Sequence, residues 1–185
     1  EQLAAATVKN LTRQEKFRLL NGKGWGPTAT EEMGIEHGMY VGNVEGVERL
    51  RIPWLKMQDS GNGFRTTEPE MVGTVTVWPS PLAAASTWDD ELVEMQAAAI
   101  GREFHSKGAN TILGPAVNVH RVTRGGRNFE YLSGEDPYLG ARLARAFIRG
   151  VHSEGIMAVV KHWAFNEQET ARNAESSQVD ARTAW

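Results

Sequence analysis

The sequence predicts an α/β fold in which helices alternate with the strands of a parallel sheet. Helical and apolar strand patterns alternate from residue 87 onward, which is the pattern of βα units. The continuous apolar run at residues 155–160 is typical of a parallel strand that is covered on both faces. Polar residues also follow three strand candidates, as they do on the catalytic face of a (β/α)₈ barrel. We therefore expect one pocket at the carboxyl ends of the strands.

Composition and charge exclude several classes of protein. Of the 185 residues, 41% are hydrophobic and 23% are charged, which is ordinary for a globular domain. The net charge is −3 and no basic stripe exists, so we expect no nucleic-acid partner. No apolar run is long enough to span a bilayer, and no segment has the layout of a signal peptide. The lack of cysteine excludes disulfides, thiolate metal sites and cysteine nucleophiles.

The first 50 residues are expected to be irregular, with one helix. Thr12 and Glu15 have the spacing of a capping box, which predicts that a helix starts there and ends near Gly22. The Gly-rich stretch at residues 22–48 predicts no regular element.

Two short strands are expected next, at residues 52–58 and 75–79. The first delivers Asp59 into a polar turn, and Arg65 follows six residues later. Because aspartate is a default turn residue, Asp59 alone fits a purely structural turn equally well.

Two helices are predicted at about residues 88–107 and 139–154, with a strand at 110–115 between them. Glycine follows each helix and suits its C-terminal cap. Both patterns place apolar residues on one face, at Val93, Ala97, Ile100 and Phe104 in the first helix and at Leu143, Phe147 and Val151 in the second.

The polar stretch at residues 125–137 is the most distinctive part of the chain. It carries three glycines, and it places Phe129 and Tyr131 close to Arg127. A surface loop anchored by its aromatic residues would explain this pattern. A binding loop that aims Arg127 is the alternative interpretation.

The apolar run at 155–160 leads directly into Lys161 and His162. A buried lysine without a partner is costly, so this junction indicates either a structural ion pair or a functional site. Because Asp59, Arg127, Lys161 and His162 all follow strand candidates, we expect their side chains to converge on one cleft.

Residues 126–137, together with Lys161, His162 and residues 166–169, closely resemble glycoside hydrolase family 3, whose best-known members are β-glucosidases. The resemblance runs from Leu11 to the end of the chain. It implies a single, incomplete N-terminal barrel domain over residues 1–185, with βα units over 51–185. A complete (β/α)₈ barrel needs about 250 residues.

The resemblance also implies that five residues hold the sugar at the non-reducing end of the substrate. A sugar needs a carboxylate acceptor and several fixed donors, and hydrogen bonds that tighten in the transition state accelerate cleavage. One departure from the family is the run 60–62, where many members have Gly-Pro; it changes the turn but keeps the spacing to the arginine. The expected substrate-binding residues are Asp59, Arg65, Arg127, Lys161 and His162.

No catalytic residue is expected in this chain. The family's nucleophilic aspartate and its acid/base glutamate are expected beyond Trp185, so the chain alone should be inactive. Five carboxylates near the motifs occupy supporting positions in the family rather than catalytic ones: Glu130, Glu135, Asp136, Glu167 and Glu169.

The leading hypothesis is therefore the glucose-binding part of a retaining β-glucosidase without cofactor or metal. A non-catalytic structural or carbohydrate-binding subunit on a truncated barrel is the second hypothesis. A metal-dependent barrel hydrolase is the third, for which only His120 and His162 stand at strand ends. The Gly125-Gly126 pair matches no phosphate-binding motif.

The expected partners are a β-glucoside and either the rest of the barrel or another chain that covers its open edge. The sequence leaves open whether it is part of a longer enzyme, one of two chains, or a half-barrel used for another purpose. The resemblance favours a secreted, vesicular or periplasmic location.

Overall fold

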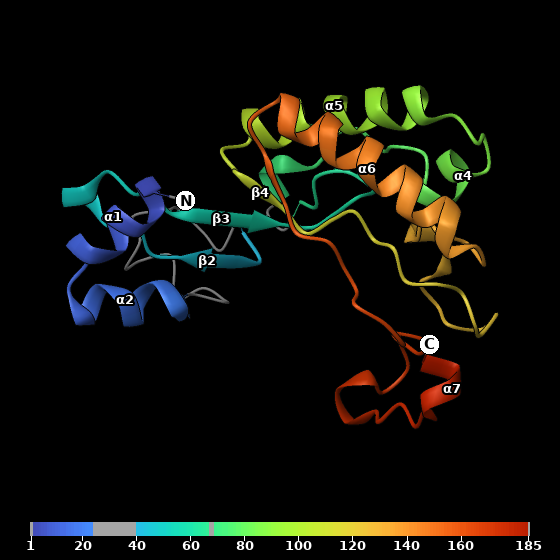
Figure 1. The fold of residues 1–185 in the computed structure, drawn as a ribbon. Helices are drawn as coiled ribbons and strands as arrows, with labels where there is room; N and C mark the ends of the chain where they lie inside the picture. The colour runs from blue at the N-terminus through green and yellow to red at the C-terminus, as the bar shows by residue number, and fades with distance from the viewer. Residues whose placement is uncertain (1, 24–39, 67–68, 185) are drawn as a thin grey trace.

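The described part of the chain forms a five-stranded mixed sheet with a helical layer beside it (Figure 1). The computed structural model describes residues 2–23, 40–66 and 69–184. The strands follow one another in the order β1 to β5, and the pairs β3–β4 and β4–β5 are parallel. Their bounds are β1 Gly22–Lys23, β2 Gly42–Val44, β3 Leu55–Gln58, β4 Thr111–Ile112 and β5 Met157–Ala158.

The parallel strands are joined by the predicted crossover helices. Helix α5 links β3 to β4, and helix α6 links β4 to β5, so this part of the chain consists of βα units as expected. The helices are α1 Gln2–Asn10, α2 Arg13–Leu20, α4 Pro81–Ala85, α5 Asp90–Ser106, α6 Pro137–Ser153 and α7 Ala181–Ala184. Short 3₁₀ turns lie at Glu48–Leu50, Pro69–Met71, Asn128–Glu130 and Arg172–Ala174.

Helices α5 and α6 lie side by side and bury the faces that their periodicity predicts (Figure 1). Asp89 caps α5 and Asp136 caps α6, each through its side chain. Gly108 and Gly155 follow the helices with positive φ, a conformation that favours glycine. The predicted faces are buried at Val93, Ala97, Ile100 and Phe104 and at Leu143, Phe147 and Val151.

The strand expected at residues 75–79 is absent, and that prediction is wrong. The side chain of Glu103 on α5 holds this segment instead. Its Oε1 accepts a hydrogen bond of 2.7 Å from the N–H of Thr76, and its Oε2 accepts one of 3.2 Å from Nε1 of Trp78. The segment is therefore fixed to a helix rather than to the sheet.

The N-terminal part is more regular than expected. The capping box at Thr12 is present, but α1 is a second helix that the sequence analysis missed. Within the stretch 22–48 that was expected to be irregular, β2 pairs antiparallel with β3 and β1 pairs antiparallel with β2, which extends the sheet. Residues 24–39 of that stretch lie outside the described residues.

The expectation that the last strand is covered on both faces is also wrong. β5 stands at the end of the strand order, and Met157 and Val160 are each 50% exposed. Figure 1 shows the following segment running away from the sheet towards α7. Among the described residues, no helix has the length and apolar character needed to cross a membrane.

Candidate sugar-binding site

Asp59 is fixed by the loop that follows β3. Ser60 and Gly63 close this loop by exchanging backbone hydrogen bonds of 2.9 and 3.0 Å. The N–H of Arg65 donates to the carbonyl of Asp59, and the buried side chain of Gln58 donates to the carbonyl of Arg65. The backbone around Asp59 is therefore held from both sides.

The same loop is attached to the hydrophobic core. The ring of Phe64 is buried and packs edge-on against Phe104 of α5, with 5.2 Å between the ring centroids. Such aromatic pairs add about 1 kcal/mol beyond the burial of their area. The core thus helps to set the position of the polar loop.

Lys161 reaches the site because the backbone segments that follow β4 and β5 continue to pair with each other. Ala116 forms parallel bridges with both Tyr131 and Lys161. The N–H of Lys161 donates to the carbonyl of Pro115, and the carbonyl of Lys161 accepts from Val117. These contacts place Tyr131, at the end of the Arg127 loop, and Lys161 next to the segment that follows β4.

A buried carboxylate joins the two cations of the site. Glu130 is 5% exposed and accepts from Nε of Arg127, while Nζ of Lys161 lies 3.4 Å from its second oxygen. The same Nζ is 3.3 Å from Oδ1 of Asp59. Burial works to lower the pKa of Arg127, but the hydrogen bond and charge of Glu130 outweigh it and raise that pKa. Arg127 is therefore charged, and Glu130 holds the side chains of both Arg127 and Lys161 in place.

Further charges extend this network towards the solvent. Nη1 of Arg127 lies 3.6 Å from Glu169, which also pairs with Arg172. On the other side, Nη1 of Arg65 is 3.5 Å from Asp59, and its side chain is 64% exposed. The outer pairs are open to water, so they contribute little to stability, and they leave donors accessible to a ligand.

These groups line one hollow of about 480 Å³ at the carboxyl ends of β3 and β5. Four of the five expected substrate-binding residues border it: Asp59, Arg65, Arg127 and Lys161. Phe129, Val75 and Val77 contribute apolar surface. A carboxylate acceptor, fixed cationic donors and apolar patches form a suitable lining for a small polyhydroxylated ligand.

His162 does not border that hollow; it lies behind it, against a buried phenol. Its Nδ1 is 3.0 Å from the hydroxyl of Tyr131, and Asn166 donates to the same hydroxyl at 2.7 Å. Burial, followed by the positive charges of Arg127 and Lys161, lowers the pKa of His162 from 6.5 to about 4. The imidazole is therefore neutral at pH 7.

Sequence reasoning did not predict the contacts made by the residues that support the site. Glu130 was assigned only a supporting position by the resemblance, and Tyr131 was described only as a loop aromatic. The available signal was a glutamate next to aromatic residues in a Gly-rich loop. Aromatic neighbours favour burial of the glutamate, and a buried carboxylate is almost always paired with a cation. Asn118 was also missed; it accepts from the N–H of Asn166 and donates to Glu167.

The structure gives no support to a metal centre in the described part of the chain. No group of three or more potential metal ligands occurs there. His120 packs edge-on against Tyr131 and borders a separate hollow of about 220 Å³ with Glu135.

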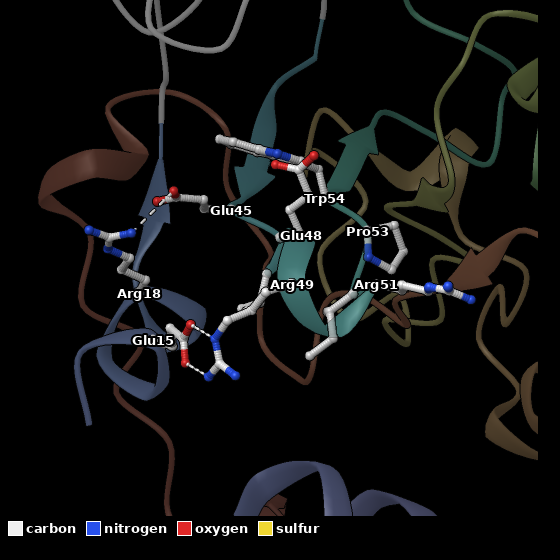
Figure 2. Close-up of a pocket in the computed structure, with 11 residues that line it drawn as sticks. Glu15, Arg18, Glu45, Glu48, Arg49, Arg51, Pro53 and Trp54 are labelled. Atoms are coloured by element: carbon white, nitrogen blue, oxygen red, sulfur yellow. Dashed lines mark hydrogen bonds and ion pairs between the residues drawn. The ribbon is translucent and has the colours of Figure 1, made fainter. Parts of the chain in front are cut away.

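A larger hollow of about 750 Å³ lies at the opposite end of β3. Figure 2 shows two ion pairs in its lining: Glu15 holds Arg49 through two hydrogen bonds, and Arg18 lies 3.6 Å from Glu45. In a barrel, the amino-terminal ends of the strands serve stability rather than chemistry. The smaller hollow at the carboxyl ends is therefore the better candidate.

Comparison with known proteins identifies a family and several relatives. The family model described as the glycosyl hydrolase family 3 N terminal domain matches residues 29–183. A β-glucosidase of Rhizobium radiobacter is 42% identical over 158 residues, which cover 84% of this chain and 19% of the relative. Thermostable β-glucosidase B of Acetivibrio thermocellus is 40% identical over 163 residues, covering 84% and 22%. The chain thus spans about a fifth of the length of these curated relatives.

Solved structures give the same result. β-Glucosidase 3B of Thermotoga neapolitana, in complex with glucose, superposes with a TM-score of 0.74 and 36% identity, covering 87% of this chain and 23% of the other. A β-glucosidase of Bifidobacterium adolescentis superposes with a TM-score of 0.70 and 33% identity, covering 89% and 21%.

Proposed function

The chain belongs to glycosyl hydrolase family 3, and on that premise we propose that its hollow is the glucose-binding subsite of a β-glucosidase. The sheet and its crossover helices are the first part of a (β/α)₈ barrel. The relatives are named β-glucosidases, and the solved relative from Thermotoga neapolitana contains glucose. The activity proposed for the whole enzyme is hydrolysis of terminal, non-reducing β-D-glucosyl residues.

The observation that carries this proposal is the ion network around Lys161. One carboxylate, Asp59, is held in place and lies beside the ammonium of Lys161, while Arg127 is fixed behind both by Glu130. Adjacent hydroxyls of a sugar ring require an acceptor next to donors in this way. Because the lining is already oriented before a ligand arrives, little ordering is needed on binding.

The carboxylates of the network are better suited to binding than to bond cleavage. Asp59 and Glu130 each pair with two cations, so neither is a free carboxylate that faces a substrate without a partner. A retaining glycosidase needs one carboxylic acid that gives up a proton and one free nucleophilic carboxylate. We therefore expect this chain to bind glucose without hydrolysing β-glucosides.

The test is a calorimetric titration of the 185-residue chain with D-glucose, alongside nitrophenol release from an aryl β-glucoside. Asp59→Asn keeps the shape but loses the charge, and should weaken glucose binding about tenfold or more. Glu94→Gln breaks the ion pair with Arg149 on α6 and serves as the matched control. Glucose binding that Asp59→Asn leaves unchanged would place the sugar elsewhere. Hydrolysis that Asp59→Asn abolishes would give Asp59 a catalytic role.

A further inference from the structure

His162 is held against two side chains that both act as donors. Asn166 Nδ2 lies 2.7 Å from the hydroxyl oxygen of Tyr131 and 3.4 Å from Nδ1 of His162. The phenol itself lies 3.0 Å from the same Nδ1. An amide nitrogen has no lone pair to offer, so Asn166 acts only as a donor at both contacts.

The proton of the phenol then has one acceptor. Tyr131 is fully buried, and burial raises its pKa, so the phenol is neutral and keeps its O–H. A buried hydroxyl proton that has no acceptor destabilises the folded state, because it loses its hydrogen bond to water and gains none. The only acceptor among the described contacts of this hydroxyl is Nδ1 of His162. That nitrogen must therefore carry a lone pair rather than a proton.

We propose that Tyr131 and Asn166 are positioning residues that hold His162 as its Nε2–H tautomer, so that the imidazole offers only a hydrogen-bond donor to a ligand. Nε2 makes no hydrogen bond within the described part of the chain and is not enclosed there, so it is open to a ligand oxygen. The neutral ring thus provides an uncharged donor on the residue that follows Lys161. That the ligand is a sugar rests on the proposed function; the tautomer does not.

The charges around the ring are consistent with this assignment. Arg127, Lys161 and Arg172 oppose protonation of the imidazole, and Glu130 favours it but does not outweigh them. The ring therefore stays neutral, and a neutral imidazole has one donor and one acceptor. With the acceptor nitrogen engaged by Tyr131 and Asn166, the donor nitrogen is the one left for a ligand.

The experiment is a long-range ¹H–¹⁵N NMR correlation on the ¹⁵N-labelled chain at pH 7, without any sugar. The His162 signals are assigned by their loss in His162→Gln. The expected spectrum has a protonated Nε2 and an unprotonated Nδ1. A protonated Nδ1 in the unmodified chain would overturn the proposal.

Two variants, compared with one control variant, test whether Asn166 and Tyr131 determine the tautomer of His162. Asn166→Asp places acceptors where the amide donated, so the proton should move from Nε2 to Nδ1 or occupy both nitrogens. Asn173→Asp makes the same change on an exposed residue and should leave the spectrum unchanged. Tyr131→Phe removes the O–H and should make Nδ1–H detectable beside Nε2–H, with circular dichroism confirming the fold. If the unmodified tautomer persists in both folded variants, these residues do not determine it.

Adding D-glucose separates this proposal from the proposed function. A shift of the Nε2 resonance with glucose supports both. An Nε2–H tautomer that Asn166→Asp reverses, with no response to glucose, keeps the positioning role and contradicts the assignment of His162 to the sugar site.

Discussion

Nζ of Lys161 lies 3.3 Å from Oδ1 of Asp59, although 102 residues separate the two in the chain. Asp59 directly follows β3, and Lys161 follows β5 after residues 159–160. Both strands belong to the parallel part of the sheet. With β4 between them, the two strands bring the acceptor and the donor to the same end of the sheet. The pair is therefore a direct consequence of the βα topology.

Removing the ammonium should weaken sugar binding. Lys161→Met keeps the length and the apolar stem of the side chain but removes the donor, so glucose should bind about ten to a hundred times more weakly, since a hydrogen bond to a charged group contributes about 1.5–3 kcal/mol. Calorimetry measures the change. Lys9→Met, on the exposed face of α1, is the control and should not alter binding. Equal effects of the two variants would exclude Lys161 from the site.

Glu130 should matter for stability as well as for binding. Glu130→Gln removes a buried negative charge that contacts both Arg127 and Lys161, whose side chains are only 18% and 13% exposed. Leaving buried cations with less compensation should lower the free energy of unfolding by about 3 kcal/mol. Urea unfolding measures this value. Glu94→Gln breaks a more exposed pair and should cost about 0.5 kcal/mol. A loss for Glu130→Gln no larger than that of the control would show that the network contributes little.

His162 should make folding stability depend on pH. Its pKa is about 4 in the folded chain and near 6.5 when unfolded, so the unfolded state binds the extra proton between these values. The contribution is present above pH 6.5 and is lost as the pH falls towards 4. Urea unfolding at several pH values should therefore show a steeper loss for the unmodified chain than for His162→Gln. His152→Gln removes an exposed histidine as a control and should follow the unmodified chain. Parallel curves for all three proteins would contradict the buried, neutral assignment.

The sequence predicted the elements whose signal is local. Helix α5 was predictable because Val93, Ala97, Ile100 and Phe104 recur at helical spacing. Residues 75–79 alternate like a strand, but their hydrogen bonds go to Glu103, a partner that no local pattern reveals. The sequence of β5 is typical of a buried strand. Its exposure in the structure depends on which segments pack against it, and a local pattern does not show this.

The residues of the candidate site also divide into those with a local sequence signal and those without one. Asp59 and Lys161 stand out because polar residues follow apolar runs, whereas the role of Glu130 depends on contacts that only the fold creates. Likewise, Tyr131 is fully buried, although the polar sequence of its loop is typical of an exposed segment. The Asp59–Ser60 and Lys161–His162 peptide bonds are cis, and a cis bond before a residue other than proline has no signature in the sequence.

The close contact between the two long helices depends on Gly150. A Cβ atom at that position would lie 2.7 Å from Cβ of Ala97 and would also collide with the carbonyl oxygen of Glu94. Gly150→Ala should therefore force α5 and α6 apart and lower the free energy of unfolding by about 1–3 kcal/mol. Thermal or urea unfolding measures the loss.

Gly101→Ala provides the matched comparison on the other helix. There the added Cβ meets the side chain of Glu154 at 3.1 Å, which requires only a small shift. The gain in helix propensity, about 1 kcal/mol, should offset that cost. If Gly150→Ala proves as well tolerated as Gly101→Ala, the helices are less closely packed than the structure indicates.

The free side of β5 should make the isolated chain associate with itself. Among the described residues β5 pairs only with β4, and it leaves Met157 and Val160 each 50% exposed. An unpaired apolar edge is a template for pairing with another strand, and a lysine placed on such an edge opposes that pairing. Sedimentation of the unmodified chain should therefore show a mass that rises with concentration, and Met157→Lys should shift the equilibrium towards the monomer.

Met95→Lys separates the effect of the edge from the effect of added charge. Met95 is also an exposed methionine, 63% exposed on α5, but it has no unpaired strand beside it. The two variants carry the same net charge, so a difference between them reports on the location of the lysine. Association that Met157→Lys reduces and Met95→Lys does not would identify the edge of β5 as the contact. If both lysines reduce association equally, the effect comes from the added surface charge and not from the edge of β5. If the unmodified chain stays monomeric at every concentration, the prediction that the edge of β5 causes association is wrong.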